Sequence, residues 1–94
     1  MIPTLISRSD VLSGHPDVDD TNLPHREFIY RQAFEMGRHI IGYEVQKVLA
    51  AVDWFAKQQQ NRTGNLGIGV AGYGEGGLIA LYSAALDERI DAAM

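Results

Sequence analysis

The chain has 94 residues, 46% hydrophobic and 21% charged, with a formal net charge of −4, which is the composition of a folded globular protein with one domain covering residues 1–94. Acidic and basic residues are intermixed, so nucleic acid is not an expected partner, and no apolar run reaches the roughly 18 residues of a membrane span. The absence of cysteine excludes disulfides, thiolate metal sites and a cysteine nucleophile, and leaves the compartment open.

The first quarter of the chain predicts a strand followed by a long loop. Residues 1–8 contain the short β-branched run "IPTLIS", which is typical of a buried strand. Residues 9–24 are dense in Ser, Asp, Gly and Pro and predict a loop that is long for a compact domain. Residues 25–60 predict a helical region with a break near Gly37 and Gly42, since glycine weakens a helix.

The second half of that helical region has the clearest periodicity. Apolar residues recur at steps of three and four, while Glu44, Lys47 and Asp53 fall largely off this stripe. The stripe consists of Ile41, Val45, Val48, Leu49, Val52, Phe55 and Ala56. This pattern predicts an amphipathic helix.

The last third of the chain predicts strand, helix and strand. Residues 66–71 alternate bulky and small side chains, which indicates a strand covered on both faces. Residues 77–88 are almost all apolar or small and predict a buried helix, and residues 90–94 predict the start of another strand. The order predicts an α/β fold: a parallel sheet of about three strands with helices on both faces.

The turn between strand and helix, "GYGEGG" at residues 72–77, allows two interpretations. As G-x-G-x-x-G it could be a dinucleotide fingerprint, whose pyrophosphate would lie at the helix N-terminus. That fingerprint needs an acidic residue about 20 positions on, at the end of the next strand, but Asp91 comes too early. Glu75 would also repel the phosphate.

The other interpretation is a nucleophile elbow, G-x-S-x-G. Glycines two residues before and after the nucleophile let the strand turn sharply into the helix and expose one side chain. Gly72 and Gly76 occupy those positions, and Gly77 extends the pattern. The nucleophile position is Gly74, which has no reacting atom.

Residues 37–93 resemble the central part of α/β-hydrolases of the dienelactone hydrolase, acetyl xylan esterase and prolyl-oligopeptidase-like group. The segments that carry the resemblance are "GRHIIGYEV", "AAVDWF", "LGIGVAGYGEGG" and "LDERI", and residues 2–8 match the family's preceding strand more loosely. The resemblance implies a partial α/β-hydrolase-like domain with residues 72–77 as its elbow. It also implies an ancestral carboxylic ester or peptide hydrolase acting by nucleophilic acyl transfer.

The sequence departs from this family at the nucleophile, where Gly74 stands in place of Ser or Cys. In the family an acid and a histidine follow later in the chain, and the residue after the nucleophile, here Glu75, offers its backbone N–H to the oxyanion hole. We therefore expect no catalysis by these 94 residues alone, with a non-catalytic binding or assembly module as the alternative and a dinucleotide-binding unit as a third. The expected ligand is a small ester or acyl group, with no cofactor and no metal, and the expected partners are missing flanking strands or a second copy at open sheet edges.

Other polar residues have simpler interpretations. Ser83 in the middle of a helix is expected to be a packing residue, and His25 and His39 surface or cap residues. Asp53 is expected to pair with a nearby cation, Arg38 or Arg62. A solvated loop rather than a metal site is expected for the acidic group His15, Asp17, Asp19 and Asp20.

Overall fold

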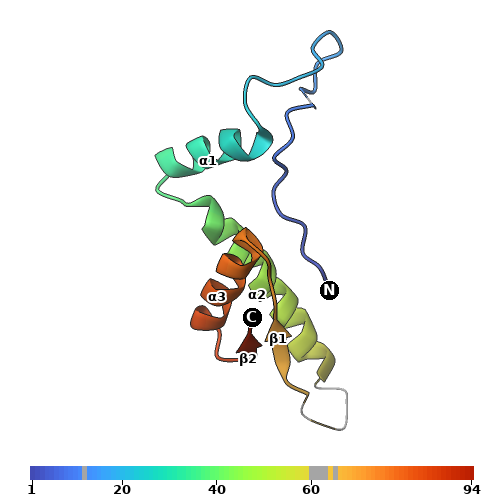
Figure 1. The fold of residues 1–94 in the computed structure, drawn as a ribbon, viewed down its shortest axis with the longest axis vertical. Helices are drawn as coiled ribbons and strands as arrows, with labels where there is room; N and C mark the ends of the chain where they lie inside the picture. Colours follow the sequence, from blue (N-terminus) through green and yellow to red (C-terminus); the bar gives the residue numbers. More distant parts are fainter. Residues whose placement is uncertain (12, 60–63, 65) are drawn as a thin grey trace. The chain divides into compact units, whose positions relative to one another are not determined.

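The computed structural model describes residues 1–11, 13–59, 64 and 66–94. The elements are α1 (His25–Glu35), α2 (Ile40–Gln59), β1 (Ile68–Val70), α3 (Glu75–Leu86) and β2 (Ile90–Ala93) (Figure 1). The described chain divides into two compact units: Thr4–Gly42, and Tyr43–Met94 together with Met1–Pro3. The α/β class is confirmed.

The N-terminal segment differs from the prediction, because residues 1–11 contain no strand. The backbone carbonyls of Ser7 and Ser9 instead accept hydrogen bonds from the N–H groups of Arg26 and His25, both at 2.9 Å. Ile2 is 94% exposed and has no packed layer against it. The described residues therefore form two strands rather than about three, since a short apolar run does not by itself specify a pairing partner.

The predicted loop, residues 9–24, is a loop in its described part, with an isolated bridge between His15 and Val18. α1 follows directly after Pro24, whose fixed φ suits a helix start. The helix ends before Gly37, which has a φ of 70°, and the N–H of Arg38 closes the end by donating to the carbonyl of Ala33 at 2.8 Å. The break between the two helices thus lies at the first of the two predicted glycines.

The last three elements form a β–α–β unit. β1 and β2 are parallel, and Ile68 pairs with Ile90, Gly69 with Ala92 and Val70 with Ala93. The chain passes between them through α3, as parallel neighbours require a crossover connection. The ladder continues beyond the strands, because the N–H of Met94 donates to the carbonyl of Val70 at 3.0 Å and the N–H of Gly72 to that of Met94 at 2.8 Å.

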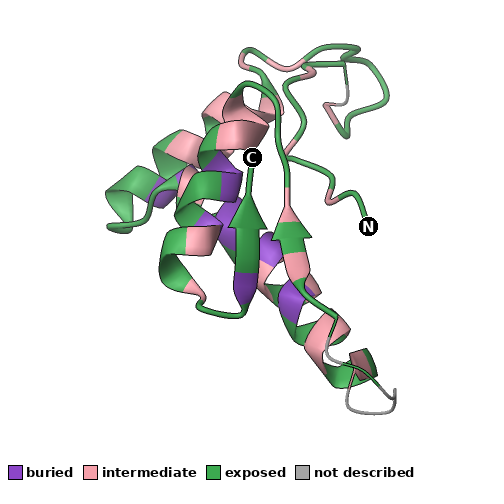
Figure 2. Cartoon of the chain, turned by 60° about the horizontal axis from the view of Figure 1, so that its bottom comes forward, coloured by how far each residue is buried: buried purple, intermediate pink, exposed green. Residues whose placement is uncertain are grey.

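The buried hydrophobic residues of α2, α3 and β2 form a core on one face of the sheet (Figure 2). Its buried residues are Val45, Val48 and Val52 of α2, Ile79 and Ala80 of α3 and Ile90 of β2. On the other face, the paired residues Gly69 and Ala92 are exposed. The prediction of helices on both faces is therefore wrong for the described residues: one face is covered.

In the described part of the chain, every helix is too short or too polar to cross a lipid bilayer.

Candidate functional site

The candidate site is the turn between β1 and α3. β1 ends at Val70 and α3 begins at Glu75, so four residues, 71–74, reverse the chain from strand to helix. Gly74 at the centre has a φ of 58° and a ψ of −123°, a combination that residues with a side chain adopt only under strain. Its carbonyl accepts hydrogen bonds from the N–H groups of Gly77 and Leu78, at 3.1 and 3.3 Å, which start the helix.

Close backbone packing explains the glycine at position 72 and, to a smaller extent, the one at position 77. A Cβ built on Gly72 would lie 2.1 Å from both the carbonyl carbon and the carbonyl oxygen of Gly76, and 2.5 Å from the nitrogen of Gly77. A Cβ on Gly77 would lie 3.3 Å from the Gly72 carbonyl oxygen. The strand end and the first turn of α3 therefore touch through their backbones, and only glycine at position 72 permits this contact.

The centre of the turn, in contrast, opens outward. A Cβ on Gly74 would meet no atom within 4 Å, and the neighbouring Tyr73 side chain is 99% exposed. Since Gly72 is bonded to Met94 beyond the end of β2, the turn lies at the carboxyl edge of the parallel pair. A side chain at position 74 would project from this edge into open space.

Glu75 is the first residue of α3. Helix N–H groups point along the axis toward the N-terminus, where they favour negative charge on a ligand or a side chain. The structure therefore places the backbone N–H of Glu75 directly beside the centre of the turn. The acidic side chain is also the first-turn charge that stabilises a helix.

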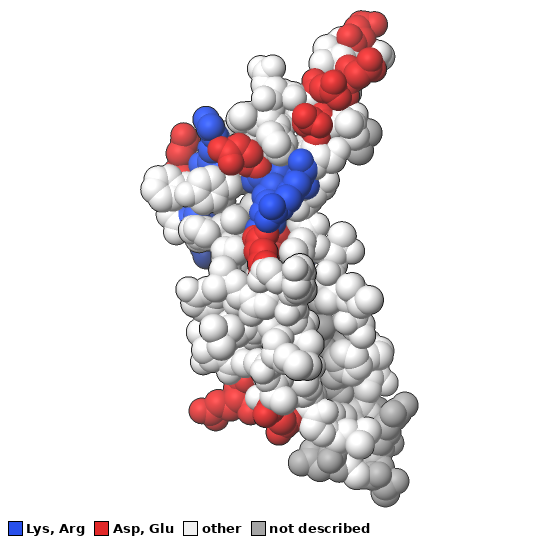
Figure 3. All heavy atoms as spheres, in the orientation of Figure 1, with Lys and Arg blue, Asp and Glu red and all other residues white. Residues whose placement is uncertain are grey.

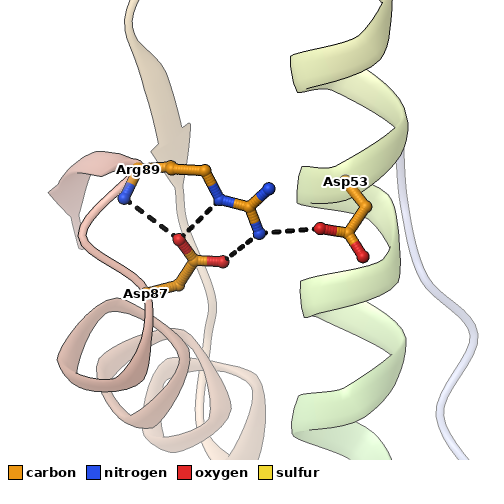
Figure 4. A network of polar contacts seen from close by, with 3 residues as sticks. All are labelled: Asp53, Asp87 and Arg89. Carbon is orange, nitrogen blue, oxygen red and sulfur yellow. Dashed lines mark hydrogen bonds and ion pairs between the residues drawn. The ribbon is translucent and has the colours of Figure 1, made fainter.

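Two of the segments that carry the resemblance, "AAVDWF" and "LDERI", meet in a polar network (Figure 4). The Arg89 guanidinium donates to both carboxylate oxygens of Asp87, from Nε at 2.8 Å and from Nη2 at 2.6 Å. Nη2 also donates to Oδ1 of Asp53 in α2 at 2.7 Å. The prediction for Asp53 is corrected here: its partner is Arg89 rather than Arg38, while Arg62 lies outside the described residues.

These bonds shift the titration of the network. The side-chain hydrogen bonds from Arg89 to Asp87, together with a bond from its backbone N–H, lower the pKa of Asp87 to about 2. The same side-chain bonds, with a further one to Asp53, raise the pKa of Arg89. Asp87 and Arg89 therefore stay ionised at neutral pH, and the network joins α2 to the connection between α3 and β2.

Asp91, the acid considered for a dinucleotide site, is engaged at the opposite edge of the sheet. Its Oδ2 accepts a hydrogen bond from the backbone N–H of Ile68, the first residue of β1, at 2.7 Å. It lies where the register shifts between Ile68 and Gly69. A ribose-binding acid belongs at the carboxyl edge, so this position does not favour the dinucleotide interpretation.

The other polar residues considered from the sequence have contacts of their own. Ser83 is fully buried and its hydroxyl donates to the carbonyl of Ile79 at 2.7 Å, as a packing residue does. His39 Nδ1 accepts from the N–H of Ile41 at 3.2 Å, at the start of α2. No group of three or more metal-ligating side chains occurs among the described residues, including His15, Asp17, Asp19 and Asp20.

One buried charge was missed by the sequence interpretation. Glu44 falls off the apolar stripe, yet its side chain is completely buried, and its Oε2 lies 2.9 Å from Nζ of Lys47. The spacing of three residues on a helix is the signal that could have indicated this pair. Its burial depends on tertiary packing, which periodicity alone does not report.

Comparison with known proteins adds no relative: no protein-family model, no curated protein and no solved structure matches this chain.

Proposed function

We propose that this chain is part of an α/β-hydrolase-like protein whose elbow has lost its nucleophile. The ancestral activity would be hydrolysis of a carboxylic ester or peptide by nucleophilic acyl transfer. The observation that carries the proposal is the backbone of Gly74, with its φ of 58° and ψ of −123° at the carboxyl edge of a parallel pair. A strained strand-to-helix turn is what exposes the nucleophile in such enzymes.

The packing of Gly72 supports the same proposal. A dinucleotide fingerprint also uses its first glycine for a tight turn and its third for helix–strand packing, and only its second lets a ligand approach the backbone. Here the first glycine is needed because the turn packs against its own helix, with Gly76 only 2.1 Å from the built Cβ. With this contact the chain turns sharply, and a Cβ at position 74 would meet no other atom within 4 Å.

Acyl transfer needs a nucleophile and a base beside it. Position 74 carries neither a hydroxyl nor a thiol, so the nucleophile is missing. We therefore infer that these 94 residues do not turn over esters. A binding or assembly module is the function that remains, with a small ester or acyl group as its ligand.

A proposal about partners follows from the sheet. Two parallel strands with both outer edges open are rarely stable in isolation. We propose that further strands extend this pair, supplied either by more of the same protein or by a second copy. The exposed face at Gly69 and Ala92 also lacks the covering layer that parallel sheets normally have.

The activity itself is tested with p-nitrophenyl acetate. We expect the unmodified chain and Glu75→Gln to release p-nitrophenolate at the same rate as buffer. Ester turnover that Glu75→Gln abolishes would instead show an active site built on that carboxylate.

The elbow geometry is tested by placing a single thiol on it, because the chain has no cysteine. In Gly74→Cys we expect a stoichiometric release of p-nitrophenolate as the thiol is acylated, and a thiol pKa below the ordinary ~8.5, because it lies at a helix N-terminus. Tyr73→Cys is the matched control, exposed and one residue away. Equal acylation rates and equal thiol pKa values in the two variants would contradict the proposal.

A further inference from the structure

An open hollow of about 850 Å³ lies within the Thr4–Gly42 unit. Its walls come from the loop before α1 and from the first part of that helix, and its apolar lining consists of Val18, Leu23, Phe28 and Ile29. The volume is within the range of sites that hold small ligands, which are also mostly apolar with a few polar groups. None of the residues of the β1–α3 turn takes part in it.

Hydrogen bonds hold the loop wall of this hollow in place. The N–H of Thr21 donates to the carbonyl of Asp10 at 2.6 Å, and the Thr21 hydroxyl donates to the carbonyl of Leu23, also at 2.6 Å. The hydroxyl of Ser13 donates to the carbonyl of Val18. These hydrogen bonds connect distant parts of the loop at residues that line the hollow.

Two lining residues have large apolar side-chain surfaces that remain exposed to solvent. Phe28 is 57% exposed and Val18 is 49% exposed. An apolar ligand would remove this surface from water. An aromatic ring also attracts a cation to its face, so Phe28 favours a ligand that is both apolar and positively charged.

The charge of the loop indicates the same ligand. Residues 9–24 contain four aspartates and neither lysine nor arginine, and acidic side chains gather over this loop in Figure 3. Asp20 lines the hollow, and within the described part of the chain no cation pairs with it. Clustered charge of one sign raises the local concentration of the opposite ion.

We propose that this hollow binds a small organic ammonium ion with an apolar body. The body contacts Val18, Leu23 and Ile29, and the ammonium group lies between the carboxylate of Asp20 and the ring of Phe28. This binding is independent of the proposed hydrolase ancestry, because it uses neither the turn nor its unit.

The test compares three probes that share one apolar body and differ in their head group: 4-phenylbutylammonium, 4-phenylbutanol and 4-phenylbutyrate. Binding to the full 94-residue chain is measured by ligand-observed NMR at low salt. We expect the ammonium probe to bind at least about fivefold more tightly than the alcohol, with the carboxylate weakest, and added salt to reduce this preference.

Three variants make the result specific. Asp20→Asn should bring the ammonium affinity down to that of the alcohol, whereas Glu35→Gln, an equal charge change at the exposed end of α1, should leave it unchanged. Phe28→Leu keeps an apolar wall and should weaken the ammonium probe about threefold with little effect on the alcohol. The proposal is overturned if no probe binds saturably below about 10 mM, if all three bind equally, or if Asp20→Asn and Glu35→Gln have the same effect.

Discussion

Four glycines of the turn after β1 are present for different physical reasons. Gly72 has no room for a side chain, because a Cβ would overlap the backbone of Gly76. Gly74 has room but an unfavourable φ, and Gly76 has room and no positive φ. Gly77 would be only slightly crowded, at 3.3 Å. The spacing in the sequence does not distinguish these positions, whereas the structure shows how much room each one has for a side chain.

This ranking is testable by alanine substitution. We expect Gly72→Ala to lower the free energy of unfolding by about 2–4 kcal/mol, since the strand end must separate from α3. Gly76→Ala, the matched control two residues into the helix, should be neutral or stabilising by up to about 1 kcal/mol. Urea unfolding followed by the fluorescence of the single tryptophan, Trp54, measures both. Equal effects would mean that the two backbones do not pack against each other.

At the scale of elements, the network of Asp53, Arg89 and Asp87 connects α2 to the β–α–β unit. An ion pair on a protein surface contributes little when it holds two flexible side chains alone. Arg89 is more constrained, because it binds both oxygens of Asp87 and an oxygen of a separate helix. Its contribution should therefore depend on the ionisation of Asp87.

The pH dependence follows from the lowered pKa of Asp87. A carboxylate whose folded-state pKa is about 2 rather than the ordinary 3.8 stabilises the fold above pH 4. That contribution is lost as the pH falls toward 2 and the group becomes protonated. We expect Asp87→Asn to be less stable than the unmodified chain at pH 7 and to lose less stability between pH 4 and pH 2.

Urea midpoints at pH 7, 4 and 2.5 measure this difference. Glu88→Gln removes one charge from the adjacent residue, which is exposed, and serves as the control. Parallel stability curves for Asp87→Asn and the unmodified chain across the acidic range would show that the Arg89 bonds do not stabilise the fold.

Local patterns were sufficient for some elements and insufficient for others. The apolar stripe located α2, and alternating small and bulky residues located β1, because these signals reside within a few turns of chain. The segment 1–8 has strand-like composition but forms no strand, and composition does not report pairing. The bond from Arg89 to Asp53 spans 36 residues, so only the assembled packing could reveal it.

Some features of the candidate site could likewise be predicted from the sequence, and others could not. The spacing of Gly72 and Gly76 around position 74 was enough to propose a strand-to-helix turn, since such turns have glycine two residues before and after their centre. It could not distinguish steric exclusion at Gly72 from open space at Gly74 and Gly76. The hollow in the Thr4–Gly42 unit left no periodic signal, because loop residues line much of it.

At the scale of the whole molecule, much apolar surface is left uncovered. Both outer edges of the two-stranded sheet are open among the described residues. α3 contains no charged residue after Glu75, and Leu81 and Leu86 are 64% and 69% exposed. A helix that is apolar on all sides is normally buried, and open strand edges favour pairing with another chain.

We therefore expect the isolated chain to self-associate as its concentration is raised. Light scattering coupled to gel filtration measures the mass at increasing protein concentration. Leu81→Lys combined with Leu86→Lys should shift the chain toward the monomer, whereas Met36→Lys, at another exposed apolar position, should not. A cooperatively unfolding monomer at all concentrations would refute both this expectation and the proposed need for further strands.

The backbone of Gly74 also makes evolutionary change at this codon asymmetric. Under the proposed ancestry, a mutation from serine to glycine at this position would relieve torsional strain of about 1–3 kcal/mol, so it would stabilise the fold while removing the nucleophile. The reverse mutation must reintroduce the strain before any partner group exists to make the hydroxyl useful. Selection for stability alone would then keep glycine at position 74.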